Sequence, residues 1–465
     1  MSFIGRTEEL AKLNKLYNSE KFEFVVIYGR RQVGKTKLIT TFCQNKKSIY
    51  FFCSKSEEKA NLERFCNDIN LFEKGTDTNQ YFKSFYEALE YVFKLAEKER
   101  IVLALDEYPY IAKQSKGFNT IVQLLIDKYR ETSKLMLIIS GSLISYMEDE
   151  VMAYKAPLYG RKTAQMKIGP LEFEKIYTYL DGFSPIDKAL IYGCFGGTPK
   201  YIADIDKNKS FEDNIKELYL DSSSYLNNEP ENLINLEIPE YQKHELVIEA
   251  IANGNAKMAD ISNYCGFNSP ETTTYLKTLI ELTYVKKDRP YGENSSRKTL
   301  YMLDDNMFRF WYRFIYKNLS VIKNGVGDSV YKKIEPYFNE YMGLVFEDIS
   351  KQYLWKLRRE DKCPVDFLSL GRWWGPDPKT RIQEEIDIVG EEDKTTALLG
   401  ECKWTNDDVD VSVLDKLIER SKLLKYTKIH FFLFSKNGFT EGCKNKANEY
   451  GNVTLVKYQD MFEDR

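Results

Sequence analysis

The feature that most restricts the fold of this chain is the segment GRRQVGKT at residues 29–36, which directly follows an apolar run at 24–28. Its spacing fits G-x-x-x-x-G-K-[ST] at every fixed position, and a helical pattern follows it. Glycines let such a loop curl so that its backbone N–H groups point inward, and the following helix adds the positive end of its dipole. The segment therefore predicts a phosphate-binding loop between a strand and a helix.

Lys35, Thr36 and two acidic residues complete the expected nucleotide site. Lys35 should contact the β- and γ-phosphates of ATP, and the Thr36 hydroxyl should ligate Mg²⁺. A second apolar run, at 101–105, ends in Asp106 and Glu107. Ligands bind at the carboxyl edge of open α/β sheets, so Asp106 should hold the magnesium through water and Glu107 should polarise the attacking water. The nucleotide-binding residues expected from the loop are Gly29, Arg30, Arg31, Gln32, Val33, Gly34, Lys35 and Thr36.

Apolar runs and helix-period segments alternate from residue 22 to 168. The runs lie at 24–28, 49–53, 101–105, 135–139 and 165–168, with helical patterns at 81–98 and 119–130. β-rich runs separated by helices predict an α/β domain whose parallel sheet is covered on both faces. The fourth run continues to Ser140-Gly141-Ser142, where a polar group could sense the γ-phosphate or could equally be a turn residue.

The chain length and the later patterns predict several domains. A chain of 465 residues is expected to form about three domains. We expect an ATPase domain at 1–170, a helical lid at 171–237, a winged helix at 238–318 and a further α/β domain at 335–465. The winged helix is predicted because short helices are followed by a basic hairpin.

Composition limits the partners and the location. A formal charge of −3 gives no overall field that would attract nucleic acid or membrane, so any contact with a polyanion must be local. Eight scattered cysteines without a C-x-x-C pair, and only two histidines, make a zinc site unexpected. Cysteines within apolar runs predict reduced thiols and a cytoplasmic protein. No signal-peptide pattern and no long apolar run is found, so no membrane contact is expected.

Three short segments resemble motifs of a known ATPase group. FIGRTEEL at 3–10 is similar to the N-terminal box of AAA-related and STAND ATPases, and PLYGR at 157–161 and GGTP at 196–199 are similar to motifs of their archaeal-type family. The resemblance implies an ASCE-type P-loop NTPase sheet. It also implies that Arg161 is an arginine finger, acting in cis or in trans, and that Pro199 approaches the nucleotide. Adenine contacts are implied for Phe3, Ile4, Gly5 and Arg6. No arginine matches the AAA sensor-2 position.

Acidic residues near the C-terminus form a second candidate site. Strand alternation places Glu401 and Lys403 on one face, and Asp387 lies on the preceding apolar strand. With Glu347 from a helix, these acids could hold a divalent metal, and Lys403 could activate water for phosphodiester attack. The predicted catalytic set is Asp387, Glu401 and Lys403, and the predicted metal ligands are Glu347, Asp387 and Glu401. The alternative is a solvated strand face with a surface ion pair.

The order of these acids resembles the PD-(D/E)XK nuclease fold, which has a restriction-endonuclease-like α/β architecture. Trp373-Trp374 and ECKW at 401–404 are similar to the C-terminal domain of unknown function that often follows archaeal-type ATPase modules. The resemblance implies metal-dependent cleavage of DNA. A nuclease fold kept only to bind DNA is left open.

Basic residues flank the predicted wing around Tyr291 and could contact DNA phosphates. They are Lys286, Lys287, Arg289, Arg297 and Lys298. The helix before them, at 270–282, would be the recognition element. Winged helices also dock proteins or serve only as structure, and the sequence leaves these roles open.

The function that these patterns favour is ATP hydrolysis coupled to an action on DNA, with metal-dependent cleavage by the C-terminal domain. The alternative is a STAND-like signalling switch whose C-terminal domain binds a protein partner and cleaves nothing. Assembly into a homo-oligomer is compatible with either function.

Overall fold

The computed structural model describes residues 4–73, 81–238, 240–293, 295 and 298–462. The chain forms two compact units, one of residues 1–171 with 198–203 and one of residues 172–197 with 204–465. The predicted regions 171–237, 238–318 and 335–465 thus fall together in the second unit, except for Leu171 and Thr198–Ala203. The Pro199 segment joins the ATPase domain instead of the predicted lid.

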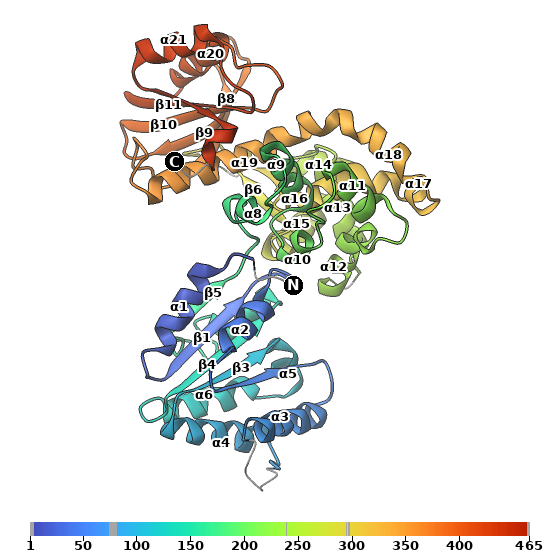
Figure 1. Cartoon of the computed structure of the whole chain (residues 1–465), viewed down its shortest axis with the longest axis vertical. Helices are drawn as coiled ribbons and strands as arrows, with labels where there is room; N and C mark the ends of the chain where they lie inside the picture. Colours follow the sequence, from blue (N-terminus) through green and yellow to red (C-terminus); the bar gives the residue numbers. More distant parts are fainter. Residues whose placement is uncertain (1–3, 74–80, 239, 294, 296–297, 463–465) are drawn as a thin grey trace. The chain divides into compact units, whose positions relative to one another are not determined.

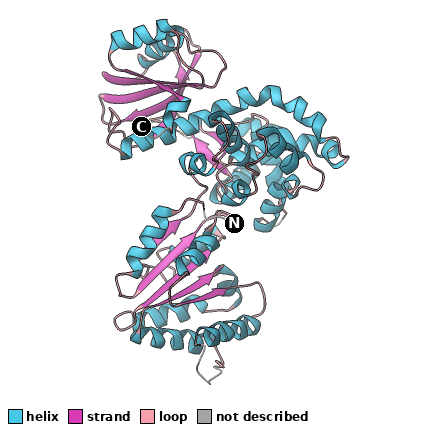
Figure 2. Ribbon diagram, in the orientation of Figure 1, coloured by secondary structure: helices cyan, strands magenta, loops and turns pink. Residues whose placement is uncertain are grey.

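The first unit contains a five-stranded parallel sheet in the order β2-β3-β4-β1-β5. Figure 2 shows these strands as one sheet between layers of helices. The parallel α/β architecture predicted for this region is confirmed. The strands are β1 (Glu23–Tyr28), β2 (Ser48–Phe52), β3 (Ile101–Asp106), β4 (Leu135–Gly141) and β5 (Ala164–Lys167).

Alternate residues of the central strands face two different hydrophobic cores. Phe24, Val26 and Tyr28 of β1 pack into one core, while Val25 and Ile27 pack into the other. Every residue of β1, β3 and β4 is buried, because both faces of the sheet are covered. The covering helices are α1 (Thr7–Tyr17), α2 (Lys35–Cys43), α3 (Glu58–Phe72), α4 (Phe85–Lys98), α5 (Pro109–Gln114) and α6 (Phe118–Tyr129), with the short α7 (Ile144–Tyr146) and α10 (Pro199–Ala203).

Helix α4 begins later than the periodic pattern at 81–98 predicted. The Ser84 side chain accepts a hydrogen bond from the Glu87 backbone N–H at 3.3 Å and caps the helix at this point. An N-cap residue adopts an extended conformation, so the helix cannot continue before Ser84. Local capping chemistry, more than hydrophobic period, therefore sets this boundary.

The second unit begins with a helical region followed by three helices and a hairpin. Strands β6 and β7 pair antiparallel, directly after α15. This is the element order that the sequence predicted for 238–318. The elements are α8 (Phe173–Tyr179), α9 (Pro185–Phe195), α11 (Phe211–Ile215), α12 (Glu229–Glu237), α13 (Gln242–Ala252), α14 (Met258–Cys265), α15 (Ser269–Glu281), β6 (Val285–Asp288), β7 (Leu300–Leu303), α16 (Asn306–Phe310), α17 (Leu319–Lys323) and α18 (Gly327–Ile334).

The C-terminal part is a five-stranded mixed sheet in the order β12-β11-β10-β9-β8. Strands β10, β11 and β12 are parallel, whereas β8 and β9 run antiparallel to their neighbours. Figure 1 shows α20 and α21 on one face of this sheet and α19 on the other. The elements are α19 (Phe338–Arg359), β8 (Leu370–Pro376), β9 (Gln383–Glu391), β10 (Thr396–Lys403), α20 (Val411–Ser421), β11 (Lys428–Ser435), α21 (Glu441–Tyr450) and β12 (Val453–Lys457).

Strand β8 was not expected from the sequence. Its segment LGRWWGP contains two glycines and a proline, which are depleted in strands. It forms the edge of the sheet, where proline is tolerated, and its pairing with β9 shifts between Gly371 and Trp373. Among the helices of the described residues, none is both long and apolar enough to cross a membrane.

Candidate functional site

The loop at 29–36 connects β1 to α2 at the carboxyl edge of the parallel sheet. Gly29 has φ +154°, and a Cβ built on it would lie 2.0 Å from the carbonyl oxygen of Ile168. Gly34 has φ +93° and caps α2. The first glycine is required by this close approach of two backbones, and the second by a left-handed conformation. These constraints give the loop the curled path that the sequence predicted.

Lys35 and Thr36 lie at the start of α2 and make distinct contacts. The Lys35 side chain is buried, and its Nζ donates hydrogen bonds to the carbonyl oxygens of Gly29 and Arg30, both at 2.9 Å. Its ammonium group is therefore held inside the curl of its own loop. The Thr36 hydroxyl donates to Asp106 Oδ2 at 2.7 Å, so the two groups predicted to hold magnesium are adjacent.

Asp106 ends β3 and is fully buried. Besides Thr36, its carboxylate accepts hydrogen bonds from the Tyr50 hydroxyl at 2.7 Å, from the Ser140 hydroxyl and from the Glu107 N–H at 3.1 Å. Burial and the neighbouring Asp106 raise the pKa of Tyr50. A carboxylate beside a threonine hydroxyl is a hard-oxygen pair that suits Mg²⁺ with water as the remaining ligands. Tyr50 was not predicted as a site residue, although the apolar run at 49–53 places it on a strand of the same sheet.

Glu107 has φ +55°, an uncommon conformation for a residue with a side chain. Its Oε2 accepts hydrogen bonds from the Ser142 backbone N–H at 3.2 Å and from the Ser142 hydroxyl at 2.8 Å. Strained backbone of this kind often occurs at functional sites. Ser140 and Ser142, left open by the sequence, each hold one of the two acidic residues, Asp106 and Glu107.

The N-terminal box and the Pro199 segment border the loop. The Arg6 guanidinium is buried and donates to the carbonyl oxygens of Val33, at 3.0 Å, and Gly169. A Cβ built on Gly34 would lie 3.6 Å from Pro199 Cγ. Ile4, two residues before Arg6, is buried, whereas Phe3 lies outside the described residues. The structure thus places Arg6 and Pro199 beside the loop.

Arg161 does not lie at this site. Its guanidinium forms two hydrogen bonds with Asp127, both at 2.7 Å, and another with the carbonyl oxygen of Pro157. It precedes β5, which runs parallel to β1, so it sits at the amino edge of the sheet while the loop sits at the carboxyl edge. Ile168 lies seven positions after Arg161, which corresponds to roughly 20 Å of extended chain. The structure therefore places Arg161 away from the phosphate-binding loop of the same chain.

The acidic residues predicted near the C-terminus lie close to one another, and basic side chains lie among them. Lys403 Nζ lies 2.7 Å from Glu401 Oε1, and Asp387 Oδ2 accepts a hydrogen bond from the Cys402 N–H at 2.8 Å. Arg420 Nη1 lies 3.3 Å from Glu401, and Arg372 Nε lies 3.6 Å from Glu347. Neither arginine was singled out from the sequence, since each lies on a different element from the acid it contacts.

Burial and mutual repulsion raise the pKa values of two of these acids. The pKa of Glu347 rises to about 8 through burial and the charge of Asp387, and the pKa of Asp387 rises to about 6 through burial and the charge of Glu401. Across the described part of the chain, no group of three or more His, Cys, Asp or Glu side chains is placed to hold a metal ion. As they lie, Glu401 is paired with Lys403 and Arg420, and Glu347 is paired with Arg372, so basic side chains balance these two carboxylates.

The basic residues of the predicted wing differ in their contacts. Lys286 lies 3.2 Å from Asp304, and Lys298 lies 3.2 Å from Glu293. Arg289 Nε donates to the Thr299 hydroxyl at 3.1 Å, whereas Lys287 is exposed on the outer side of β6. Arg297 falls outside the described residues. Most of these charges therefore have acidic or polar neighbours within the module.

Comparisons with known proteins match two separate parts of the chain. Residues 3–205 match the model of a family described as "ATPase domain predominantly from Archaea". Residues 311–415 match one described as "Archaea bacterial proteins of unknown function". The chain is 33% identical, over 99% of its own length and 100% of the other, to the uncharacterized protein MJECL04 of Methanocaldococcus jannaschii.

Two of the solved structures that resemble the chain are a Walker-type ATPase and an ORC2 protein. The Walker-type ATPase PABY2304 of Pyrococcus abyssi gives a TM-score of 0.52 at 17% identity, covering 67% of this chain and 96% of that one. The Aeropyrum pernix ORC2 protein, solved as ADPNP and ADP complexes, gives a TM-score of 0.47 at 14% identity, covering 70% of this chain and 94% of that one. The first likeness establishes an ATPase fold built on a central parallel sheet.

Proposed function

The chain belongs to the family of archaeal-type ATPases in which an ATPase domain precedes a C-terminal domain of unknown function, and we propose that it couples ATP hydrolysis to an action on DNA. The observation that carries the ATPase half is the convergence of the phosphate-binding loop with Asp106 and Glu107 at one edge of the sheet. Bound ATP with Mg²⁺ supplies the phosphoanhydride bond that is cleaved and the positive charge that balances the phosphates.

The residues of this chain then have separate tasks. Lys35 would hold the β- and γ-phosphates, and Thr36 with Asp106 would hold the metal. Glu107 orients the attacking water and accepts its proton. Ser142 fixes the Glu107 carboxylate through two hydrogen bonds, so this base is positioned by the end of β4.

The covalent connection at 196–199 offers a route from the nucleotide site to the second unit. The last turn of α9 is anchored there, because the Tyr341 hydroxyl donates to the Gly193 carbonyl at 2.6 Å and Asn306 Nδ2 donates to the Tyr192 carbonyl at 3.3 Å. A few residues later the chain reaches Pro199, beside Gly34 of the phosphate-binding loop. A movement of the loop on hydrolysis would pass along this backbone to α9.

The DNA half of the proposal rests on the module of α13, α14, α15 and the β6–β7 hairpin. In a winged helix, α15 would enter the major groove and the hairpin would contact the phosphate backbone. Lys277 on α15 and Lys287 on β6 are exposed, and the Lys277 side chain retains 76% of its accessible surface. The alternative, a STAND-like switch, would use the same surface for a protein partner.

We expect duplex DNA to bind with an affinity that falls steeply as salt rises. Replacing both Lys277 and Lys287 with alanine should weaken binding to a 30-base-pair duplex about 10-fold and reduce the salt slope by about 2, since two phosphate contacts are lost. Fluorescence anisotropy between about 50 and 200 mM salt measures both quantities. The matched control is Lys12→Ala with Lys59→Ala, which removes two exposed lysines of the first unit. Absent binding, or equal loss in both double variants, would favour the signalling switch.

We propose that Arg161 is an arginine finger that acts in trans. Because the residue sits at the edge of the sheet opposite its own loop, the phosphates it meets must belong to a second copy of the chain. We expect ATP turnover per chain to rise with protein concentration, and Arg161→Ala to lower turnover about 10³-fold while nucleotide binding is retained. Steady-state rates over a dilution series check this. A concentration-independent rate would leave Arg161 with its structural bond to Asp127.

Metal-dependent cleavage of DNA by the C-terminal sheet is a second candidate activity. The observation that favours it is that Asp387, Glu401 and Lys403 converge on neighbouring strands, where burial and the charge of Glu401 raise the pKa of Asp387, a repulsion that a bound cation would relieve. The observation that opposes it is the pairing of Glu401 with Lys403 and Arg420, and of Glu347 with Arg372.

The two possibilities differ in a direct assay. If the site cleaves, wild-type protein should take up Mn²⁺ in a calorimetric titration and nick plasmid DNA, and Lys403→Ala should stop nicking while metal uptake persists. Asp387→Ala should lose the metal itself. If neither uptake nor nicking is seen in the wild type, the sheet is a binding domain whose acids are held by Arg372 and Arg420.

A further inference from the structure

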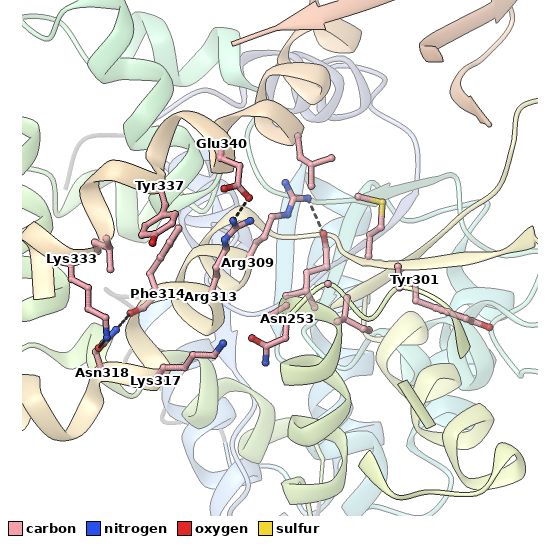
Figure 3. Close-up of a pocket in the computed structure, with 18 residues that line it drawn as sticks. Asn253, Tyr301, Arg309, Arg313, Phe314, Lys317, Asn318, Lys333, Tyr337 and Glu340 are labelled. Carbon is pink, nitrogen blue, oxygen red and sulfur yellow. Dashed lines mark hydrogen bonds and ion pairs between the residues drawn. The ribbon is translucent and has the colours of Figure 1, made fainter. Parts of the chain in front are cut away.

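A cavity of about 640 Å³ lies in the second unit, and its lining shares no residue with the ATPase site or the acidic cluster. Figure 3 shows the side chains around it, which come from α13, β7, the helical stretch 309–318, α18 and α19. This volume lies within the range of pockets that bind small ligands. The cavity is therefore large enough for an organic ligand and is not explained by the proposed ATPase mechanism.

Arg309 gives the cavity a buried positive charge with an unsatisfied donor. The residue retains only 7% of its accessible surface, and its Nη2 donates to the Leu303 carbonyl at 2.9 Å and lies 3.8 Å from Asp348. Its Nη1 is buried and has no hydrogen-bond partner. A buried guanidinium N–H without an acceptor is costly, and native proteins rarely leave one unpaired. The Arg309 side chain lines the cavity, so its positive charge, which Asp348 only partly balances, contributes to the field there.

Three more cations line the same cavity. Arg313, Lys317 and Lys333 join Arg309 there, against the single acidic residue Glu340. Glu340 already pairs with Arg313 at 2.7 Å, and both are labelled beside Arg309 in Figure 3. The lining thus carries an excess of three positive charges. An anion with more than one negative charge, such as a phosphate group, matches this balance.

Part of the remaining lining is apolar, and it offers an aromatic ring. Ile251, Phe314 and Ile334 form part of the wall, and the Tyr337 side chain is 54% exposed while lining the cavity. An exposed tyrosine ring provides a flat surface on which a nucleobase can stack. A bare phosphate ion would use the cations and leave these apolar surfaces uncovered.

We propose that this cavity binds a free nucleotide, with its phosphate against Arg309, Arg313 and Lys317 and its base against Tyr337. The ligand is distinct from the ATP of the phosphate-binding loop, and the site would let the second unit respond to a small molecule. The inference does not depend on DNA binding, so the two can fail separately.

The test uses the full chain carrying Lys35→Ala, with GMP, UMP and inorganic phosphate as probes in isothermal titration calorimetry. These monophosphates lack the β- and γ-phosphates that Lys35 would contact, so the loop contributes little to the signal. We expect one saturable site per chain for at least one of the two nucleotides. Lys317→Ala and Tyr337→Ala should each raise its Kd about 10-fold, since a charge-assisted contact and a stacking contact are lost. Both residues are exposed, whereas Arg309 also supports the Leu303 carbonyl and its loss could disturb folding.

Lys332→Ala is the matched control, because Lys332 is an exposed lysine of α18 that does not line the cavity. It should leave the Kd unchanged. Three outcomes would overturn the proposal: no saturable nucleotide binding, equal Kd values in the Lys317→Ala and Lys332→Ala proteins, or inorganic phosphate binding as tightly as the nucleotides. The last would mean an adventitious anion site without recognition of a base.

Discussion

Lys35→Ala is expected to reduce ATP turnover by at least about 10²-fold, to the level of the assay background. Removing a preorganised positive charge from a transferring phosphoryl group costs this much or more, because the charge acts where negative charge accumulates. In the structure the Lys35 ammonium donates hydrogen bonds to two carbonyl oxygens of its own loop, those of Gly29 and Arg30. A phosphate oxygen can replace those neighbours without moving the sheet.

The matched control is Lys37→Ala, which makes the same chemical change two residues later on the exposed side of α2. It should keep wild-type turnover. Both variants should unfold at nearly the same temperature as the wild type, since the core contacts of α2 come from Leu38, Ile39 and Phe42. Steady-state phosphate release and a thermal melt check the pair. Unchanged turnover in Lys35→Ala would remove the nucleotide site from this loop.

The ATPase site was largely predictable because its chemistry is encoded in contiguous segments. The loop glycines, Lys35 and Thr36 occupy fixed positions in one motif, and Asp106 and Glu107 end one apolar strand. Parallel pairing of β1 with β4, and of β4 with β3, then brings the two segments to one edge of the sheet. The hydrogen bonds around Asp106 and Glu107 were not predicted. They involve Tyr50 from β2 and depend on side-chain directions, which hydrophobic periodicity does not determine.

The C-terminal site was only partly predictable because its partners come from several elements. Alternation correctly placed Glu401 and Lys403 together, and the antiparallel pairing of β9 with β10 brings Asp387 beside them. The two arginines that contact the acids come from β8 and α20, whose positions depend on tertiary packing. An acidic pattern on a strand predicts charge, but it does not reveal whether a metal or an arginine balances that charge.

Glu107→Gln is expected to slow ATP hydrolysis by about 10²-fold or more while leaving ATP binding intact. The amide cannot accept a proton from the attacking water, and general-base catalysis typically contributes a factor of about 10² to 10⁴. Binding should persist because the loop contacts are untouched and the amide oxygen can still accept hydrogen bonds from Ser142. The variant should therefore accumulate as a stable ATP complex, which filter binding or a fluorescent nucleotide would detect.

Two comparisons make this result specific to Glu107. Glu131→Gln makes the same change in an exposed residue of the turn before β4, at the opposite edge of the sheet, and should keep wild-type rates. Asp106→Asn should instead weaken binding of Mg²⁺ and the nucleotide, because Asp106 lies against Thr36 and carries the charge that faces the metal. The two acids thus separate binding from chemistry. If Glu107→Gln lost ATP binding while its residual turnover stayed normal, the base would have to be sought on another residue near Ser142.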